Sequence, residues 1–149
     1  MTRRPGFALP AVLGALIVMA MLVAVGAQRA LLAARDGALA EARVQMAAAT
    51  ETALAEVLAR GADTVALRAT PAGGVLDSGT AMVGTAAARW RLNVVMAPVA
   101  LLSIDASAPV VAGSARTAWR VWLRSRGDAA GRPVWSPDGT GLWTQLPSP

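Results

Sequence analysis

Three features of this 149-residue sequence predict an α+β fold, in which a long N-terminal helix packs on a small antiparallel sheet of about three to five strands. A charge-free apolar run occupies residues 7–27. Helical character continues to about residue 61, with many alanines and no proline after the run. Short alternating segments separated by turn residues fill the rest of the chain, and a helix followed by a run of strands is typical of α+β domains.

The apolar run at residues 7–27 is predicted to cross a membrane as a helix. Roughly 20 apolar residues at about 1.5 Å each match the ~30 Å hydrocarbon core of a bilayer. A cleaved secretory signal is the main competitor, but its apolar core is only about 7 to 15 residues long. Cleavage after the small residues Val25-Gly26-Ala27 is one alternative, and an ordinary single-pass anchor is another.

The helix is expected to continue outside the membrane over residues 28–61. Four apolar residues follow one another at spacings of 7, 7 and 11, which at about 100° per residue keeps them in one narrow stripe. We therefore expect the upper half of this helix to pack on the sheet, and Gly61-Ala62-Asp63 to end it. The stripe consists of Leu32, Leu39, Met46 and Val57.

A flexible connection is predicted for residues 62–84 because of its Thr70-Pro71-Ala72-Gly73-Gly74 segment, and a small β-rich head for residues 85–149. Alternation predicts a half-buried strand over residues 89–96. Its predicted inward residues are Trp90, Leu92, Val94 and Met96.

Ala97-Pro98 forms a break suited to a hairpin or bend. A second strand is predicted over residues 99–107, with Leu101 and Ile104 as core candidates, and a third over about 115–126. Val134-Trp135 and Leu142-Trp143 are expected to face each other across a Pro-Asp-Gly turn.

Composition removes most catalytic chemistry. Cysteine, histidine and lysine are absent, and all 14 basic residues are arginine. Thiol nucleophiles, Ser-Lys dyads, Schiff-base lysines, imidazole bases, and thiolate and imidazole metal ligands are therefore missing. Among the carboxylates, Glu51 and Glu56 are five residues apart on a helix, and Asp128 and Asp138 lack the alternating acids of a calcium loop. We therefore expect no enzyme activity, no catalytic residue, no metal site and no cofactor.

Tryptophan and arginine mix near the end of the head and form a candidate interaction face. A nucleic acid would use such residues through stacking and phosphate pairing, but a solvated strand face with buried tryptophans is favoured. The lysine-free, alanine-rich composition favours codon bias over a selected basic patch, although the net charge is +5, so nucleic acid is not an expected partner. The face consists of Trp119, Arg120, Trp122, Arg124 and Arg126.

A short basic leader ends in glycine just before the apolar run, in the order Arg3-Arg4-Pro5-Gly6 and then Phe7-Ala8-Leu9-Pro10. This junction resembles the class III leader of type IV pilins and type II secretion pseudopilins. The resemblance implies that prepilin peptidase cuts between Gly6 and Phe7 and methylates Phe7, while Arg3 and Arg4 hold the leader in the cytosol. Residues 1–6 are then the leader, and residues 7–27 the transmembrane and filament-core helix.

Most major pilins carry a glutamate at the fifth position after the cut, where this chain has Ala11. A charge in hydrocarbon is costly and is kept for a task, and its lack is associated in the family with minor subunits. The resemblance thus implies a minor pilin or pseudopilin that is incorporated in, or primes, a type IV pilus or type II secretion filament. Its implied partners are other pilin or pseudopilin subunits, prepilin peptidase and the inner membrane.

The resemblance also sets the orientation, with a cytoplasmic N-terminus and an extracytoplasmic head. Charge alone leaves the orientation nearly undecided, because Arg29, Arg35 and Arg43 follow the apolar run while Arg3 and Arg4 precede it. The alternative is a single-pass membrane-anchored extracytoplasmic binding domain without filament assembly.

Overall fold

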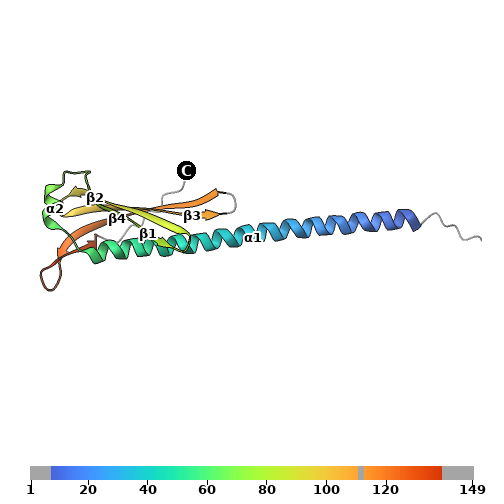
Figure 1. The fold of residues 1–149 in the computed structure, drawn as a ribbon, viewed down its shortest axis with the longest axis horizontal. Helices are drawn as coiled ribbons and strands as arrows, with labels where there is room; N and C mark the ends of the chain where they lie inside the picture. The colour runs from blue at the N-terminus through green and yellow to red at the C-terminus, as the bar shows by residue number, and fades with distance from the viewer. Residues whose placement is uncertain (1–7, 111–112, 139–149) are drawn as a thin grey trace, which may run out of the picture. The chain divides into compact units, whose positions relative to one another are not determined.

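The computed structural model describes residues 8–110 and 113–138, with side chains from Val12 onward. The chain divides into two compact units, Met1–Ala38 and Leu39–Pro149. The elements in chain order are α1 (Ala8–Arg60), α2 (Thr64–Ala69), β1 (Val75–Val83), β2 (Ala86–Met96), β3 (Val99–Val110), β4 (Gly113–Gly127) and β5 (Pro133–Pro137), as labelled in Figure 1.

The five strands form one antiparallel sheet in the order β1-β2-β3-β4-β5, so each strand pairs with its neighbours in sequence. Strand pairing aligns buried residues in rows across the sheet: Trp90 lies opposite Ile104, which in turn lies opposite Trp119. A second row joins Leu92 of β2 to Leu102 of β3. The predicted α+β fold, a long N-terminal helix on an antiparallel sheet of three to five strands, is confirmed.

Residues 39–60 of α1 pack on one face of this sheet. Their buried residues recur every one to four positions, which is the period of one helix face, and several are alanines that permit a close approach. The apolar ones among them share one core cluster with Trp90, Leu102, Ile104 and Leu123 of the sheet. The buried helix residues are Ala42, Met46, Ala49, Thr50, Ala53 and Val57.

The predicted apolar stripe of α1 is therefore buried only in its upper part. Met46 and Val57 are 4% and 2% exposed, whereas Leu39 is 36% exposed. Leu32, in the first unit, is 57% exposed. The expectation that the upper half of the helix packs on the sheet is confirmed.

Polar contacts attach both ends of this helix segment to the sheet. Near its start, the Gln45 side-chain oxygen accepts hydrogen bonds from the backbone N–H (3.2 Å) and the hydroxyl (2.9 Å) of Thr85, in the β1–β2 turn. At its end, Arg60 donates to Asp77 Oδ2 at 3.0 Å, and its guanidinium carbon lies 5.1 Å from the centre of a Trp90 ring. Hydrogen bonds to Glu56 and then to Asp77 raise the pKa of Arg60.

The stretch 62–84, expected to be a flexible connection, contains α2 and β1. Asp63 caps α2 by accepting hydrogen bonds from the backbone N–H groups of Val65 (3.0 Å) and Ala66 (2.9 Å), and Leu67 is buried. The sequence of β1 alternates poorly and contains several small residues, and β1 lies at the edge of the sheet. Its pairing with β2 supplies the order that local sequence did not predict.

Two predicted core residues lie elsewhere. Met96 is 72% exposed because the β2–β3 register shifts between Val94 and Met96, at the end of β2. Leu101 and Ile104 are three residues apart, so they face opposite sides of β3, and only Ile104 is fully buried. Ala97-Pro98 does join β2 to β3 as an antiparallel hairpin.

The last predicted strand pair is described only in part. Val134 and Trp135 lie in β5, which pairs with β4. Leu142 and Trp143 lie outside the described residues, so their expected position across the Pro-Asp-Gly turn stays a prediction. The position of β5 beside β4 makes Trp135 part of the core.

Replacing Gly79 with alanine is expected to destabilise the second unit by about 1–3 kcal/mol, the usual cost of overpacking. A Cβ at Gly79 would lie 2.6–2.9 Å from ring atoms of Trp90, which is 1% exposed and has no room to move. Gly127→Ala is the control, because a Cβ there meets its nearest atom at 3.8 Å. Denaturant unfolding in detergent, followed by tryptophan fluorescence, measures the difference; equal stability of the two variants would contradict the close approach.

Candidate functional site

The first unit contains a helix segment that is long and apolar enough to span a membrane. From Val12 to Val25, every large apolar side chain is 47–70% exposed. The consecutive residues Leu16, Ile17, Val18 and Met19 point in all directions around α1, because successive residues differ by about 100°. A helix that is apolar all round is suited to lipid or to a bundle of other apolar helices.

The second candidate site is the sheet face opposite α1, here called the open face. Because side chains alternate along a strand, Arg120, Trp122, Arg124 and Arg126 of β4 share this face. Trp122 is 46% exposed. Trp119 alternates with these four residues along β4, so it lies on the helix-covered face and packs against the core. Four of the five residues of the predicted interaction face therefore share the open face, and Trp119 does not.

Asp138 forms ion pairs with two arginines of the open face. Arg124 Nη2 donates to Asp138 Oδ2 at 2.8 Å, and Arg126 Nη2 lies 3.8 Å from Oδ1. The backbone N–H of Asp138 donates to the carbonyl of Trp122 at 2.9 Å, which places the carboxylate beside β4. The hydrogen bond from Arg124 lowers the pKa of Asp138 and raises that of Arg124.

Sequence reasoning missed the part of the open face that β2 and β3 contribute. Arg89 and Arg91 of β2 are exposed, and strand pairing places Arg91 opposite Ser103, which lies opposite Arg120. Arg89 of β2 lies opposite Asp105 of β3 in the strand pairing. The sequence did contain a signal for this part of the face. Arg89 and Arg91 flank Trp90, and when a tryptophan on a strand is buried, its two neighbours lie on the opposite, outward face.

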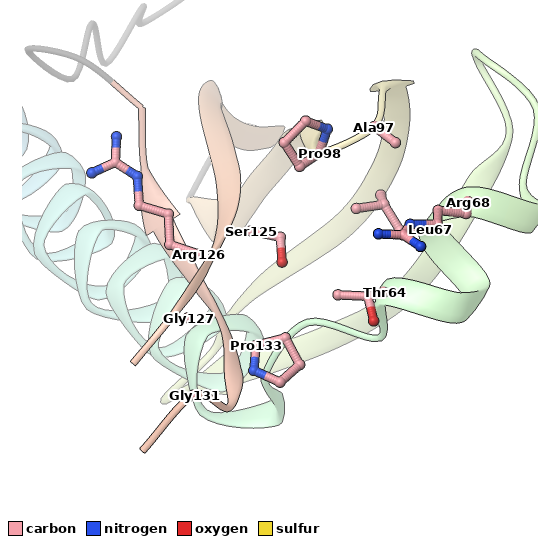
Figure 2. Close-up of a pocket in the computed structure, with 10 residues that line it drawn as sticks. All are labelled: Thr64, Leu67, Arg68, Ala97, Pro98, Ser125, Arg126, Gly127, Gly131 and Pro133. Carbon is pink, nitrogen blue, oxygen red and sulfur yellow. The ribbon is translucent and has the colours of Figure 1, made fainter. Parts of the chain in front are cut away.

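A pocket of about 500 Å³ lies between α2, the β2–β3 turn and the loop before β5, and Figure 2 shows its lining. Two of its residues, Arg68 and Arg126, are arginines. The Arg126 guanidinium points away from the α2 side of the pocket, so the two charges do not converge on one point. The remaining lining residues are Thr64, Leu67, Ala97, Pro98, Ser125, Gly127, Gly131 and Pro133.

Of the four carboxylates considered in the sequence, Glu56, Asp128 and Asp138 form local hydrogen bonds or ion pairs. Asp128 accepts hydrogen bonds from the backbone N–H groups of Ala130 and Arg132, both at 2.8 Å, and from Arg132 Nε at 2.9 Å. These bonds, led by that from the Arg132 backbone, lower the pKa of Asp128. Glu56 pairs with Arg60. Within residues 8–110 and 113–138, no three His, Cys, Asp or Glu residues are grouped to hold a metal ion.

The residues that carry the resemblance to pilins lie at the start of the chain. Arg3, Arg4, Gly6 and Phe7 are outside the described residues, and Ala11 lies within α1. Comparison of the chain with protein-family models, curated proteins and solved structures gives no match.

Replacing Val18 with arginine is expected to reduce membrane integration severalfold, because a charge near the middle of a spanning helix costs about 2.5–3.5 kcal/mol on insertion scales. Val44→Arg is the matched control, since Val44 is an exposed valine of α1 in the second unit. The measurement is the fraction of full-length chain that resists alkaline extraction from membranes. An equal loss in both variants would contradict a membrane role for the run around Val18.

The lowered pKa of Asp138 predicts a pH-dependent contribution to stability. It is present above the ordinary aspartate pKa of about 3.9 and is lost as pH falls through the lower folded value. Asp138→Asn should therefore unfold more easily than the parent protein at pH 6, and this gap should narrow towards pH 3. Thermal unfolding across this pH range tests it, with Asp36→Asn as an exposed control in the first unit. A gap that stays constant with pH would show that the carboxylate charge is unimportant.

Proposed function

We propose that this chain is a minor pilin or pseudopilin, a non-enzymatic structural subunit of a type IV pilus or type II secretion filament. Prepilin peptidase cuts it between Gly6 and Phe7 and methylates Phe7, after which the subunit enters or primes the filament. The observation that carries the proposal is the junction of a basic, glycine-ended leader, Arg3-Arg4-Pro5-Gly6, with a long uncharged helix.

The exposed apolar helix supports this proposal. Its side chains from Val12 to Val25 have no covering partner among the described residues, so they need lipid before assembly and other apolar helices after it. Moving from lipid to a helix bundle exchanges one apolar environment for another, and close packing of small residues drives such association. Gly14 fits this use, because a Cβ built there meets no atom within 4 Å and its face is free to approach another helix.

The second unit supports a structural role for the head. It has its own core and an open sheet face rich in arginine. Its carboxylates form local contacts: Asp128 accepts hydrogen bonds within a turn, and Asp138 pairs with Arg124 of β4. In the proposed arrangement the chain crosses the inner membrane once, with its N-terminus in the cytoplasm and the head outside. Ala11, in place of the usual glutamate, favours a minor or initiating subunit over a major one.

The second candidate is a single-pass anchored extracytoplasmic binding domain without filament assembly. The open face favours it, because exposed arginines and Trp122 offer a binding surface that needs no other subunit. The two candidates share the membrane helix and differ in processing at Gly6.

Mass spectrometry of the chain purified from membranes of a host with prepilin peptidase is expected to show a mature N-terminus at Phe7 carrying one methyl group. Gly6→Val should abolish this cleavage, because the new side chain occupies the position that the peptidase reads. Gly14→Val is the control, since it changes a glycine of α1 where a Cβ has open space.

An intact Met1, or cleavage after Ala27, would contradict the proposal and favour the anchored domain or a secretory signal. Unchanged processing of Gly6→Val would contradict it as well. Activity of a cytosol-only reporter fused after Pro149 would overturn the proposed orientation.

A further inference from the structure

We propose that Arg91, Ser103 and Arg120, on the open face, form a binding site for a carboxylate side chain in an extended segment of a partner protein. Three neighbouring strands supply one residue each, in direct register. This site goes beyond the filament role and does not depend on processing at Gly6.

Strand geometry brings the three side chains together. Arg91 pairs with Ser103, and Ser103 pairs with Arg120, so all three point from the same face. Neighbouring strands are about 4.8 Å apart, which places the two arginine backbones roughly 10 Å apart with the serine between them. Two guanidinium groups leaning inward from that distance can hold one anion over the short serine hydroxyl, which supplies a further donor.

Neither arginine has an acidic partner within the described part of the chain. Arg91 and Arg120 are both exposed, and no ion pair or side-chain hydrogen bond joins either to a described residue. By contrast Arg60, Arg124 and Arg132 all contact carboxylates. Two like charges on either side of one serine repel each other, and a bound anion would relieve that repulsion.

The next row of the sheet adds an apolar contact area. Asn93, Leu101 and Trp122 are paired across the same three strands, and Trp122 is 46% exposed. An aromatic ring beside an arginine pair is typical of the residues that dominate protein–protein interfaces. A partner segment lying across the open face would therefore meet charge and apolar surface together.

Negative charges on the same face favour a protein segment over a nucleic acid. Asp105 follows Ser103 by two residues on β3, which places its backbone about 7 Å away, and it faces Arg89 of β2. Asp138 lies beside Trp122 and neutralises Arg124. A continuous phosphate chain would meet both carboxylates, whereas a single carboxylate meets only the Arg91–Arg120 pair. In an extended partner segment, a basic residue two positions from the bound acid would lie beside Asp105. The reason is that Asp105 is also two residues from Ser103 along β3, so the two spacings are equal.

The test uses the full chain in uncharged detergent micelles and a fluorescein-labelled peptide of glycine and serine that carries one glutamate and one lysine two residues apart. Fluorescence anisotropy at low ionic strength is expected to show saturable binding. The double variant Arg91→Gln, Arg120→Gln should weaken binding by about tenfold or more, because both charged donors are lost. Arg68→Gln, which removes an exposed arginine elsewhere on the head, should change binding by less than about twofold.

A second comparison tests the role of Asp105. The parent chain should prefer the glutamate–lysine peptide over a peptide with two glutamates in the same positions. Asp105→Asn should remove that preference while leaving both arginines in place. Thermal unfolding of each variant checks that the head remains folded, which is expected because all the altered residues are exposed.

Several results would overturn the proposal. Absence of binding by the parent chain would do so, as would equal weakening by Arg68→Gln, which would indicate a general charge effect. Equal binding of a peptide with glutamine in place of glutamate would show that the carboxylate is not recognised. Tighter binding of a 12-nucleotide oligothymidylate, or full displacement of the peptide by inorganic phosphate at equal concentration, would assign the face to phosphate instead.

Discussion

The limited space around Trp90, in the core that it shares with an alanine-rich helix face, is the constraint on which the head depends. Ala49 and Ala53 are fully buried and leave room for the large residues of the sheet, above all Trp90 at 1% exposure. Gly79, which pairs with Trp90 from the edge strand, leaves room for the ring beside it, and the Arg60 guanidinium lies over a Trp90 ring at the helix end. The helix, the edge strand and the central strands thus all approach the Trp90 side chain. The volume around this ring therefore limits the size of the residues that each of these elements can have there.

One-sided burial determines the character of the opposite face. Because α1 covers one face of the sheet, alternate residues from Ala86 to Val94 of β2 and from Ala100 to Ala108 of β3 are apolar and buried, and the residues between them are free to be charged. Arginines on β2 and β4 therefore flank β3, whose Ser103 is short enough to leave space between them. The same alternation separates Trp119, which packs in the core, from Trp122, which is half exposed.

The first unit follows a different constraint. Its apolar side chains surround α1 on all sides and are exposed within the described part of the chain, so lipid or a bundle of other apolar helices suits them. In the proposed filament role, lipid and the apolar stems of other subunits are the two environments that this helix would meet in turn. The subunit would then act through the surfaces that its helix and its head present.

The sequence by itself determined the features that follow from local periodicity: the apolar run, the end of α1 at Gly61, and the alternation that buries Trp90 and Leu92. It also contained the glycine-ended leader on which the filament proposal rests. Only the tertiary structure decided that residues 62–84 contain α2 and β1, since an edge strand gains its order from pairing rather than from its own pattern. The Arg91–Ser103–Arg120 row was likewise decided by the tertiary structure, because strand register depends on turn geometry as well as on the hydrophobic pattern, and the β2–β3 register shifts between Val94 and Met96.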